Sequence, residues 1–187
     1  ATLLAHLEKI VQYNVQSSEK EKFDGVMLDI EPYISDSWKE NPEEYMDRYI
    51  SCMKKGYKFA QKNHLRTAIC IPRHYDNQGL TSGLEELIKE TCDEVAVMNY
   101  SCGNEIEAIR TEAALSEKYG KELHCILEFQ EVGKHGLTEN KTYRNKGIDN
   151  AKETWEKLQK EYKNINVTRD YHWSRPVREM LEEKNAD

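Results

Sequence analysis

Residues 23–33 read Phe-Asp-Gly-Val-Met-Leu-Asp-Ile-Glu-Pro-Tyr, and this stretch decides the fold class that the sequence predicts. A short apolar run that ends in acids and a proline is typical of a β-strand. Strand side chains alternate between two faces, so Met27, Asp29 and Glu31 are predicted to share one face. Pro32 cannot donate to a sheet and ends the strand, which places both carboxylates at its carboxyl end.

The other face of this strand carries Val26, Leu28 and Ile30, which we expect to be fully buried. Ionised groups beside an apolar stack are costly unless they serve a purpose, so a functional site is favoured. In α/β barrels the active site lies at the carboxyl end of the strands. The alternative is that the two acids only end the strand, cap the next helix or pair with a basic neighbour.

The rest of the chain alternates between helical and strand periodicity. We expect strands over residues 23–31, 67–72, 94–100, 122–129 and 165–171, and helices over 2–19, 83–91, 104–119 and 176–181, from Pro42 onward and around Trp155. Helices between strands imply a parallel sheet with right-handed crossovers. The predicted fold class is α/β, in one domain over residues 1–187 or part of one.

The composition favours a small neutral ligand over nucleic acid or a membrane. The chain has 27 basic and 34 acidic residues, a net charge of -7 and no basic patch interleaved with aromatic residues. No apolar run approaches the roughly 18 residues of a membrane span, and the amphipathic start is not a signal peptide. Secretion or a cell-surface location is expected only if the protein degrades glycans, and the compartment is otherwise open.

Neither cysteine nor histidine forms a metal-binding or disulfide pattern. The five cysteines form no CxxC pair, and their odd number argues against a disulfide scaffold, so we expect mostly free thiols. The six histidines show no HExxH or similar ligand spacing. We therefore expect no metal and no cofactor.

Three motifs together resemble a known family. Asp24-Gly-Val-Met-Leu-Asp-Ile-Glu31 resembles the fourth-strand signature, DGxDxDxE, of family 18 glycoside hydrolases, the chitinase-like barrels. Residues 95–100, Val-Ala-Val-Met-Asn-Tyr, are similar to the sixth-strand Met-x-Tyr of that family, and Trp173 resembles the aromatic residue under its central sugar. The motifs come in family order, and the resemblance covers nearly all of the chain.

This resemblance implies an (α/β)8 barrel that acts on glycans. Glu31 would protonate the leaving oxygen as general acid, and Asp29 would orient the acetamido group of the substrate as internal nucleophile. Tyr100 would hydrogen-bond that group, with Met98 beside it in the same motif. Met27 stands where the family has its middle Asp, which favours a second reading: a carbohydrate-binding or scaffold barrel without turnover.

A third reading is a retaining glycosidase with a separate nucleophile. Alternation places His124, Ile126 and Glu128 on one face of their strand, with Glu128 near its carboxyl end. Glu31 and Glu128 would then be the acid/base and the nucleophile, with carboxyl groups about 5 Å apart. The alternative for Glu128 is an ion-paired acid at a strand end.

Further binding groups follow two other strands. Arg73, His74 and Tyr75 come after the strand at 67–72, and Tyr171, His172 and Trp173 come at the end of the last strand. Aromatic faces stack on sugar rings, and Arg or His bind hydroxyl groups, so this clustering suits a carbohydrate cleft. The alternative is that the two aromatic residues only cover the barrel mouth.

The chain is shorter than the roughly 250 residues of a complete barrel. If residues 23–31 form strand four, the chain covers strands four to eight, and a partial barrel exposes a sheet edge. We therefore predict an open edge beside residues 24–31. Three explanations stay open at this point: a lost amino-terminal part, self-association through the edge, or a smaller open sheet.

Overall fold

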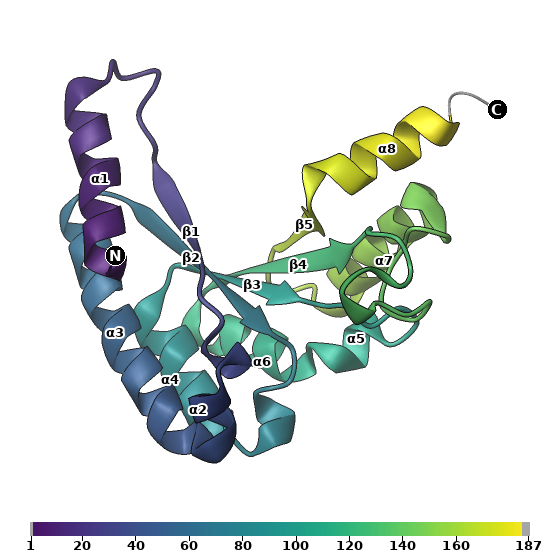
Figure 1. Ribbon diagram of the computed structural model, residues 1–187, viewed down its shortest axis with the longest axis horizontal. Coiled ribbons are helices and arrows are strands. Elements are labelled where there is room, and N and C mark those ends of the chain that lie inside the picture. The colour runs from purple at the N-terminus through teal and green to yellow at the C-terminus, as the bar shows by residue number, and fades with distance from the viewer. Residues whose placement is uncertain (1, 185–187) are drawn as a thin grey trace. The chain divides into compact units, whose positions relative to one another are not determined.

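A computed structural model describes residues 2–184 and shows an α/β fold with five parallel strands (Figure 1). The order of the strands in the sheet follows the chain, β1-β2-β3-β4-β5. Their bounds are β1 Gly25–Asp29, β2 Arg66–Pro72, β3 Glu94–Met98, β4 Glu122–Glu128 and β5 Val167–His172. The predicted α/β class, strand number and parallel arrangement are confirmed, whereas the partial barrel over strands four to eight stays a prediction.

Helices lie between the strands, as predicted. Their bounds are α1 Leu3–Gln16, α2 Asp36–Glu40, α3 Pro42–Lys62, α4 Thr81–Thr91, α5 Glu105–Ala108, α6 Arg110–Tyr119, α7 Gly147–Glu161 and α8 Ser174–Lys184, with short 3-10 turns η1 Pro32–Ile34, η2 Asp76–Gln78 and η3 Lys134–Gly136. Helix α3 begins at Pro42 because the Asn41 side chain accepts from the Glu44 N–H. None of the helices in residues 2–184 is long and apolar enough to cross a membrane.

Two predicted elements differ from the structure. The helix expected over 104–119 is two helices, because Ile109 leaves helical geometry (φ -126°, ψ 19°) between α5 and α6. Strand β1 ends at Asp29, so the prediction that Glu31 lies within the strand is wrong. Glu31 instead precedes η1 with φ -108° and ψ 73°. Strand alternation therefore gives no reason for Glu31 to share a face with Asp29.

The described chain forms two compact units. The first comprises residues 2–71 and 75–95, and the second comprises residues 72–74 and 96–184. In the first unit α3 packs against α1 and α4, and its buried face includes Tyr49 and Met53. Cys52, between them in sequence, is exposed. The expectation of a single domain stays a prediction.

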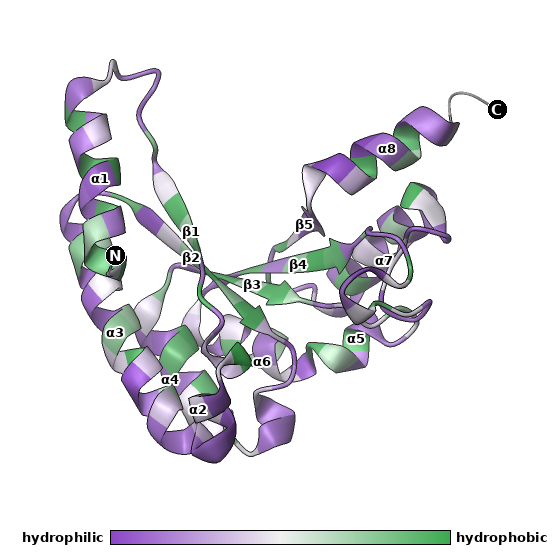
Figure 2. Cartoon of the chain, viewed as in Figure 1, coloured by the Kyte–Doolittle hydropathy of each residue, from purple (hydrophilic) through white to green (hydrophobic). Residues whose placement is uncertain are grey.

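The core of the second unit is built on β4. Leu123, Cys125 and Leu127 are each fully buried, and the strand is apolar along most of its length (Figure 2). From α7, the indole N–H of Trp155 donates to the Cys125 carbonyl at 3.0 Å, which joins the helix to the strand. The expectation that Trp155 is a core residue is confirmed, since it is 4% exposed.

Strand β1 lies at one edge of the sheet, next to β2, so the predicted open edge beside residues 24–31 is confirmed. The expectation that Val26, Leu28 and Ile30 are fully buried is wrong, because all three are only partly buried. On this edge strand Met27 is 51% exposed. An edge strand lacks a neighbour on one side, which leaves its side chains less covered than those of a central strand.

Gly25 lies where β1 approaches β2 most closely. A Cβ atom at this position would lie 2.9 Å from the Arg66 carbonyl oxygen and 3.1 Å from the Arg66 Cβ. Those atoms belong to the backbone or its first side-chain carbon, so they cannot move aside cheaply. Close packing against Arg66 thus explains why a glycine stands at position 25.

All five cysteines are free thiols, as expected for most of them, but their exposure differs. Cys70, Cys92 and Cys125 are buried, Cys102 is partly buried and Cys52 is exposed on α3. Burial raises the pKa of the Cys125 thiol to about 12. Burial, with the nearby Glu105 charge, raises the pKa of Cys102 to about 11.

Candidate active site

The two acids of the first motif lie at the carboxyl end of β1. Asp29 is the last residue of the strand and is exposed, whereas Glu31 follows it and is partly buried. The Tyr33 hydroxyl donates a hydrogen bond to Glu31. Pro32 positions this tyrosine by starting the turn η1 directly after Glu31. Glu31, just after the first strand, therefore accepts a hydrogen bond from a tyrosine that the turn η1 holds in place.

Aromatic rings surround this carboxylate. The rings of Tyr33 and Tyr75 lie 6.1 Å apart in an edge-to-face arrangement, and Trp38 lies 5.5 Å from Tyr75. Burial, followed by the hydrogen bond to Glu31, raises the pKa of Tyr33 well above its usual range. Burial, followed by the charge of Glu31, also raises the pKa of Tyr75. Both phenols are therefore neutral and able to donate at physiological pH.

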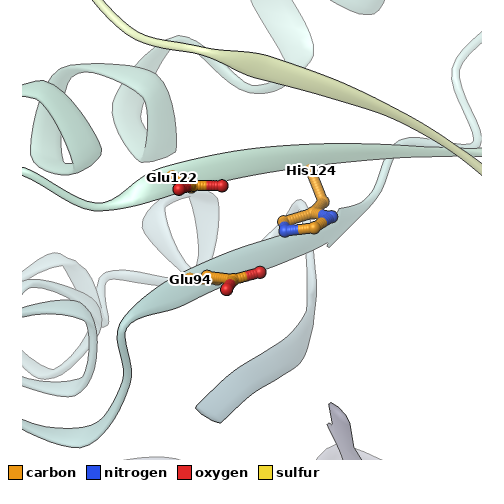
Figure 3. A group of neighbouring side chains, drawn as sticks. All are labelled: Glu94, Glu122 and His124. Atoms are coloured by element: carbon orange, nitrogen blue, oxygen red, sulfur yellow. The ribbon is translucent and has the colours of Figure 1, made fainter. Parts of the chain in front are cut away.

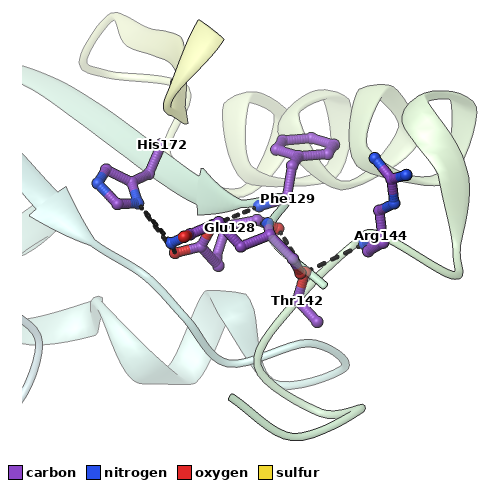
Figure 4. A network of polar contacts seen from close by, with 6 residues as sticks. Glu128, Phe129, Thr142, Arg144 and His172 are labelled. Atoms are coloured by element: carbon purple, nitrogen blue, oxygen red, sulfur yellow. Dashed lines mark hydrogen bonds and ion pairs between the residues drawn. The ribbon is translucent and has the colours of Figure 1, made fainter. Parts of the chain in front are cut away.

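In the second unit Glu128 is the last residue of β4 and is 2% exposed. Its Oε1 accepts the backbone N–H groups of Phe129 and Gln130, both at 2.8 Å. Its Oε2 lies 2.9 Å from His172 Nδ1 and accepts from the Gln130 side-chain amide at 3.1 Å (Figure 4). Four donors thus surround one buried carboxylate.

The donors decide the charge of Glu128. Burial alone raises the pKa of a carboxyl group, but the hydrogen bonds from His172 and Gln130 and the charge of His172 outweigh it. The pKa of Glu128 is therefore lowered, and the group is ionised at neutral pH. An ionised carboxylate accepts hydrogen bonds only and does not serve as a general acid.

His172 ends β5 and brings further predicted residues together. Its ring lies 6.1 Å from the ring of Tyr100, and its side chain is 47% exposed. Tyr171 and Trp173, its neighbours in sequence, are 48% and 47% exposed. Half-exposed aromatic residues can offer faces to a ligand, and the Tyr171 ring also packs edge-on against Phe129 at 6.4 Å. The binding role and the packing role of these two residues both stay predictions.

The remaining predicted residues also follow or end strands. Met98 is the last residue of β3 and is partly buried. Arg73 and His74 directly follow β2 and are partly exposed. All nine predicted site residues thus lie at or just after the carboxyl ends of strands. That Asp29 and Glu31 share a pocket with Tyr100, and that Glu31 and Glu128 face one substrate, stay predictions.

The loop after β4 hydrogen-bonds the backbone carbonyl of Glu128. The Tyr143 N–H donates to the Glu128 carbonyl at 2.8 Å, and the Thr142 hydroxyl donates to the same carbonyl at 3.3 Å. Arg144, next along this loop (Figure 4), donates to the Pro176 carbonyl at 3.0 Å and pairs with Glu183 at 2.6 Å. The loop after β4 is therefore tied both to the strand and to α8.

Charged side chains also lie nearer the amino ends of two strands. Glu122 and His124 project from one face of β4, and Glu94 lies at the start of β3 (Figure 3). In the second unit His124 Nδ1 lies 2.8 Å from an Asp170 carboxylate oxygen. In the first unit Glu94 pairs with Arg66 at 2.6 Å. These contacts fit the role of structural ion pairs.

Sequence reasoning placed His172 among the binding groups that follow the last strand, but it did not pair His172 with Glu128, and it did not assign Tyr33 or Gln130 to the site. Tyr33 had a local signal, because it follows the acid-proline pair by one residue. His172 lies 44 residues from Glu128 in sequence, and no periodic pattern connects them.

Comparisons of the chain with protein-family models, with curated proteins and with solved structures found no match.

Proposed function

We propose that this chain is a glycoside hydrolase-like protein that cleaves O-glycosidic bonds, with Glu31 as general acid. The observation that carries this proposal is the place of Glu31, directly after the carboxyl end of a parallel strand and hydrogen-bonded by Tyr33. In the proposed arrangement the chain corresponds to strands four to eight of a family 18 barrel. Glu31 then protonates the leaving oxygen of the substrate.

The other strand ends supply the remaining roles in this proposal. Asp29 orients the acetamido group of the substrate, and Tyr100 hydrogen-bonds that group. Tyr171 and Trp173 offer half-exposed aromatic faces that suit sugar rings. Arg73 and His74 supply polar groups for hydroxyls. The ligand class is a neutral carbohydrate, which fits an acidic chain with no basic patch.

The surroundings of Glu128 disfavour the retaining mechanism with Glu128 as nucleophile. A nucleophilic carboxylate must reach the anomeric carbon with one oxygen, but both oxygens of Glu128 already accept two hydrogen bonds each. The group is also almost fully buried. Glu31 is therefore the carboxylate that we assign to the chemistry.

Met27 favours one alternative function, carbohydrate binding without turnover. It stands in the place of the middle Asp of the family motif and is 51% exposed. A methionine there cannot share a proton or charge with Asp29, so the step that needs Asp29 loses a partner. In this alternative the rim binds a glycan, and the bond is not cleaved.

Hydrolysis of aryl glycosides with and without an N-acetyl group separates the two functions. Turnover restricted to N-acetyl sugars supports the substrate-assisted reaction that the family resemblance implies. Binding of N-acetyl oligosaccharides in calorimetry with no turnover supports the alternative. Neither binding nor turnover with any sugar would refute both.

Glu31→Gln is the sharpest single test of the assigned role. The amide keeps the shape and still accepts from Tyr33, so the fold is expected to survive, as circular dichroism would show. Turnover should fall by about a hundredfold to ten-thousandfold, the usual contribution of general acid catalysis. Glu8→Gln, on the exposed face of α1, is the matched control and should keep full activity. Unchanged turnover in Glu31→Gln would remove Glu31 from the mechanism.

A further inference from the structure

The hydrogen bonds of Glu128 show what this residue holds in place. Two of its four donors are backbone N–H groups of the segment directly after β4, and a third is the Gln130 side chain from the same segment. The fourth is His172, from the end of the neighbouring strand β5. Glu128 therefore fixes one half-exposed side chain, the imidazole of His172.

This contact also fixes the protonation pattern of the imidazole. The Glu128 carboxylate is ionised and can only accept, so the hydrogen between Nδ1 and Oε2 must belong to Nδ1. In its neutral form His172 then carries its proton on Nδ1 and a lone pair on Nε2. Nε2 lies on the far side of the ring from Glu128 (Figure 4). The imidazole thus presents an acceptor on the side away from the carboxylate.

The surroundings of His172 suit a polyhydroxylated ligand. Its side chain is 47% exposed, and its ring lies 6.1 Å from the Tyr100 ring at an angle of 35°. Trp173, the next residue, is about equally exposed, whereas the Tyr171 ring packs edge-on against Phe129 at 6.4 Å. A hydrogen-bond acceptor among aromatic faces is a common arrangement for sugar rings, whose hydroxyls donate while their apolar faces stack.

We infer that His172 is a ligand-contacting residue, which in its neutral form accepts a hydrogen bond from a sugar hydroxyl through Nε2, and that Glu128 is its positioning residue. The nature of the ligand rests on the proposed function, whereas the pairing of Glu128 with His172 does not. In this arrangement Glu128 contributes to ligand binding only by positioning His172. The inference assigns Glu128 a role different from that of a nucleophile.

Nitrogen-15 NMR of the imidazole tests the pairing without any substrate. Above the pH at which the imidazole loses its charge, which the same titration locates, neutral His172 should be the Nδ1–H tautomer. In Glu128→Gln the amide oxygen keeps the backbone N–H bonds and its NH2 group faces Nδ1, so the Nε2–H tautomer should replace it. Glu156→Gln, an exposed change on α7, should leave the tautomer unchanged. An Nε2–H tautomer in the unsubstituted protein overturns the inference.

Calorimetry with tri-N-acetylchitotriose tests the contact and the positioning role together. His172→Ala should weaken binding about threefold to tenfold, the usual net value of one hydrogen bond. If Glu128 acts only through His172, the double variant Glu128→Gln/His172→Ala should bind no more weakly than His172→Ala. Losses that add in the double variant, or unchanged binding in His172→Ala, overturn the inference. His6→Ala, exposed on α1, is the control.

Two outcomes separate this inference from the proposed function. If the unsubstituted protein binds no sugar at all, the proposed function fails and the ligand contact falls with it, while the tautomer result alone decides the pairing. Glu128→Gln changes a buried site, so circular dichroism and thermal unfolding should check that each variant is folded. Where that variant does not fold, the tautomer of the unsubstituted protein and the binding of His172→Ala still decide.

Discussion

The side chain of Glu31 is partly buried and accepts from Tyr33, whereas Glu128 is 2% exposed and accepts from four donors. Both are carboxylates at the ends of parallel strands, but their hydrogen bonds differ in number and kind. A carboxylate surrounded by donors stays ionised and fixed, which suits it to hold a neighbouring group. Glu31, which is only partly buried, leaves more of its carboxylate accessible to a substrate.

The lowered pKa of Glu128 predicts a dependence of stability on pH. A group with a lower pKa in the folded state stabilises the protein above its unfolded value, about 4.3, and loses this contribution as pH falls through the folded value. Glu128→Gln should therefore be less stable than the unsubstituted protein at pH 7, and the difference should shrink toward pH 3. Urea unfolding at both pH values measures this, at about 1.4 kcal/mol per unit of pKa shift.

Glu156→Gln is the control for this experiment, because its carboxyl is exposed and no hydrogen bond in the described structure is assigned to it. It should follow the pH curve of the unsubstituted protein. If the difference between Glu128→Gln and the unsubstituted protein stays constant from pH 7 to pH 3, the ionised state of Glu128 does not contribute to stability.

For single residues, the sequence predicted the place in the fold better than the function of the side chain. Alternation correctly makes Glu128 the last residue of a buried strand, because a strand with buried residues on both faces gives a strong signal. It could not reveal that His172 supplies a donor, since that contact joins residues 44 apart. For Glu31 the strand pattern was extended two residues too far, because alternation does not show that the pairing with β2 stops at Asp29.

Strands β1 and β4 differ in burial although both were expected to be buried. Every residue of β4 after Glu122 is buried, whereas no residue of β1 is. The difference comes from their places in the sheet, with β1 at an edge and β4 between two neighbours. Burial of this kind depends on which strands pair, and a local sequence pattern does not contain that information.

Two leucine truncations measure this difference. Leu127→Ala in β4 removes a fully buried side chain and should cost about 2–5 kcal/mol of unfolding free energy. Leu28→Ala in β1 removes a partly buried one and should cost clearly less. Chemical denaturation of both variants gives the comparison. Equal losses would mean that β1 is covered as completely as β4.

Gly25→Ala tests the close approach of β1 to β2. The added methyl group would lie 2.9 Å from the Arg66 carbonyl oxygen, so the two strands must separate locally. We expect a loss of about 1–3 kcal/mol in unfolding free energy, the usual cost of overpacking. Asp24→Ala is the neighbouring control, since Asp24 is exposed and its contact with β2 uses only its backbone carbonyl. A neutral Gly25→Ala would show that the strands separate without cost.

At the scale of the whole molecule, the regular alternation of helix and strand was enough to predict a parallel sheet of five strands. The open edge was predicted from the length of the chain, which is too short for the barrel that the family resemblance implies. Each crossover needs a helix, so the order of elements restricts the topology strongly. The two compact units were not predicted, because the break between them falls within β3 and no change in composition marks it.

The open edge at β1 predicts association between copies of the chain. Met27 is 51% exposed on this strand, and edge strands with apolar side chains tend to pair with other chains. Light scattering should show a mass that rises with protein concentration, and Met27→Lys should reduce that rise. Val132→Lys, an equally apolar exposed site in the second unit, should not. A constant monomer mass at all concentrations would contradict an associating edge.

The five thiols differ in exposure, so the rates at which they react report how often the protein opens locally. A thiol reacts as its thiolate, so the raised pKa of Cys125 and Cys102 and the burial of Cys70 and Cys92 slow their modification. Cys52 on α3 is the one exposed cysteine. A thiol reagent should therefore label Cys52 first, the partly buried Cys102 more slowly, and Cys70, Cys92 and Cys125 only as the protein opens. A fluorophore can be placed on α3 without any substitution, and the slow phase times the exposure of the β-sheet core.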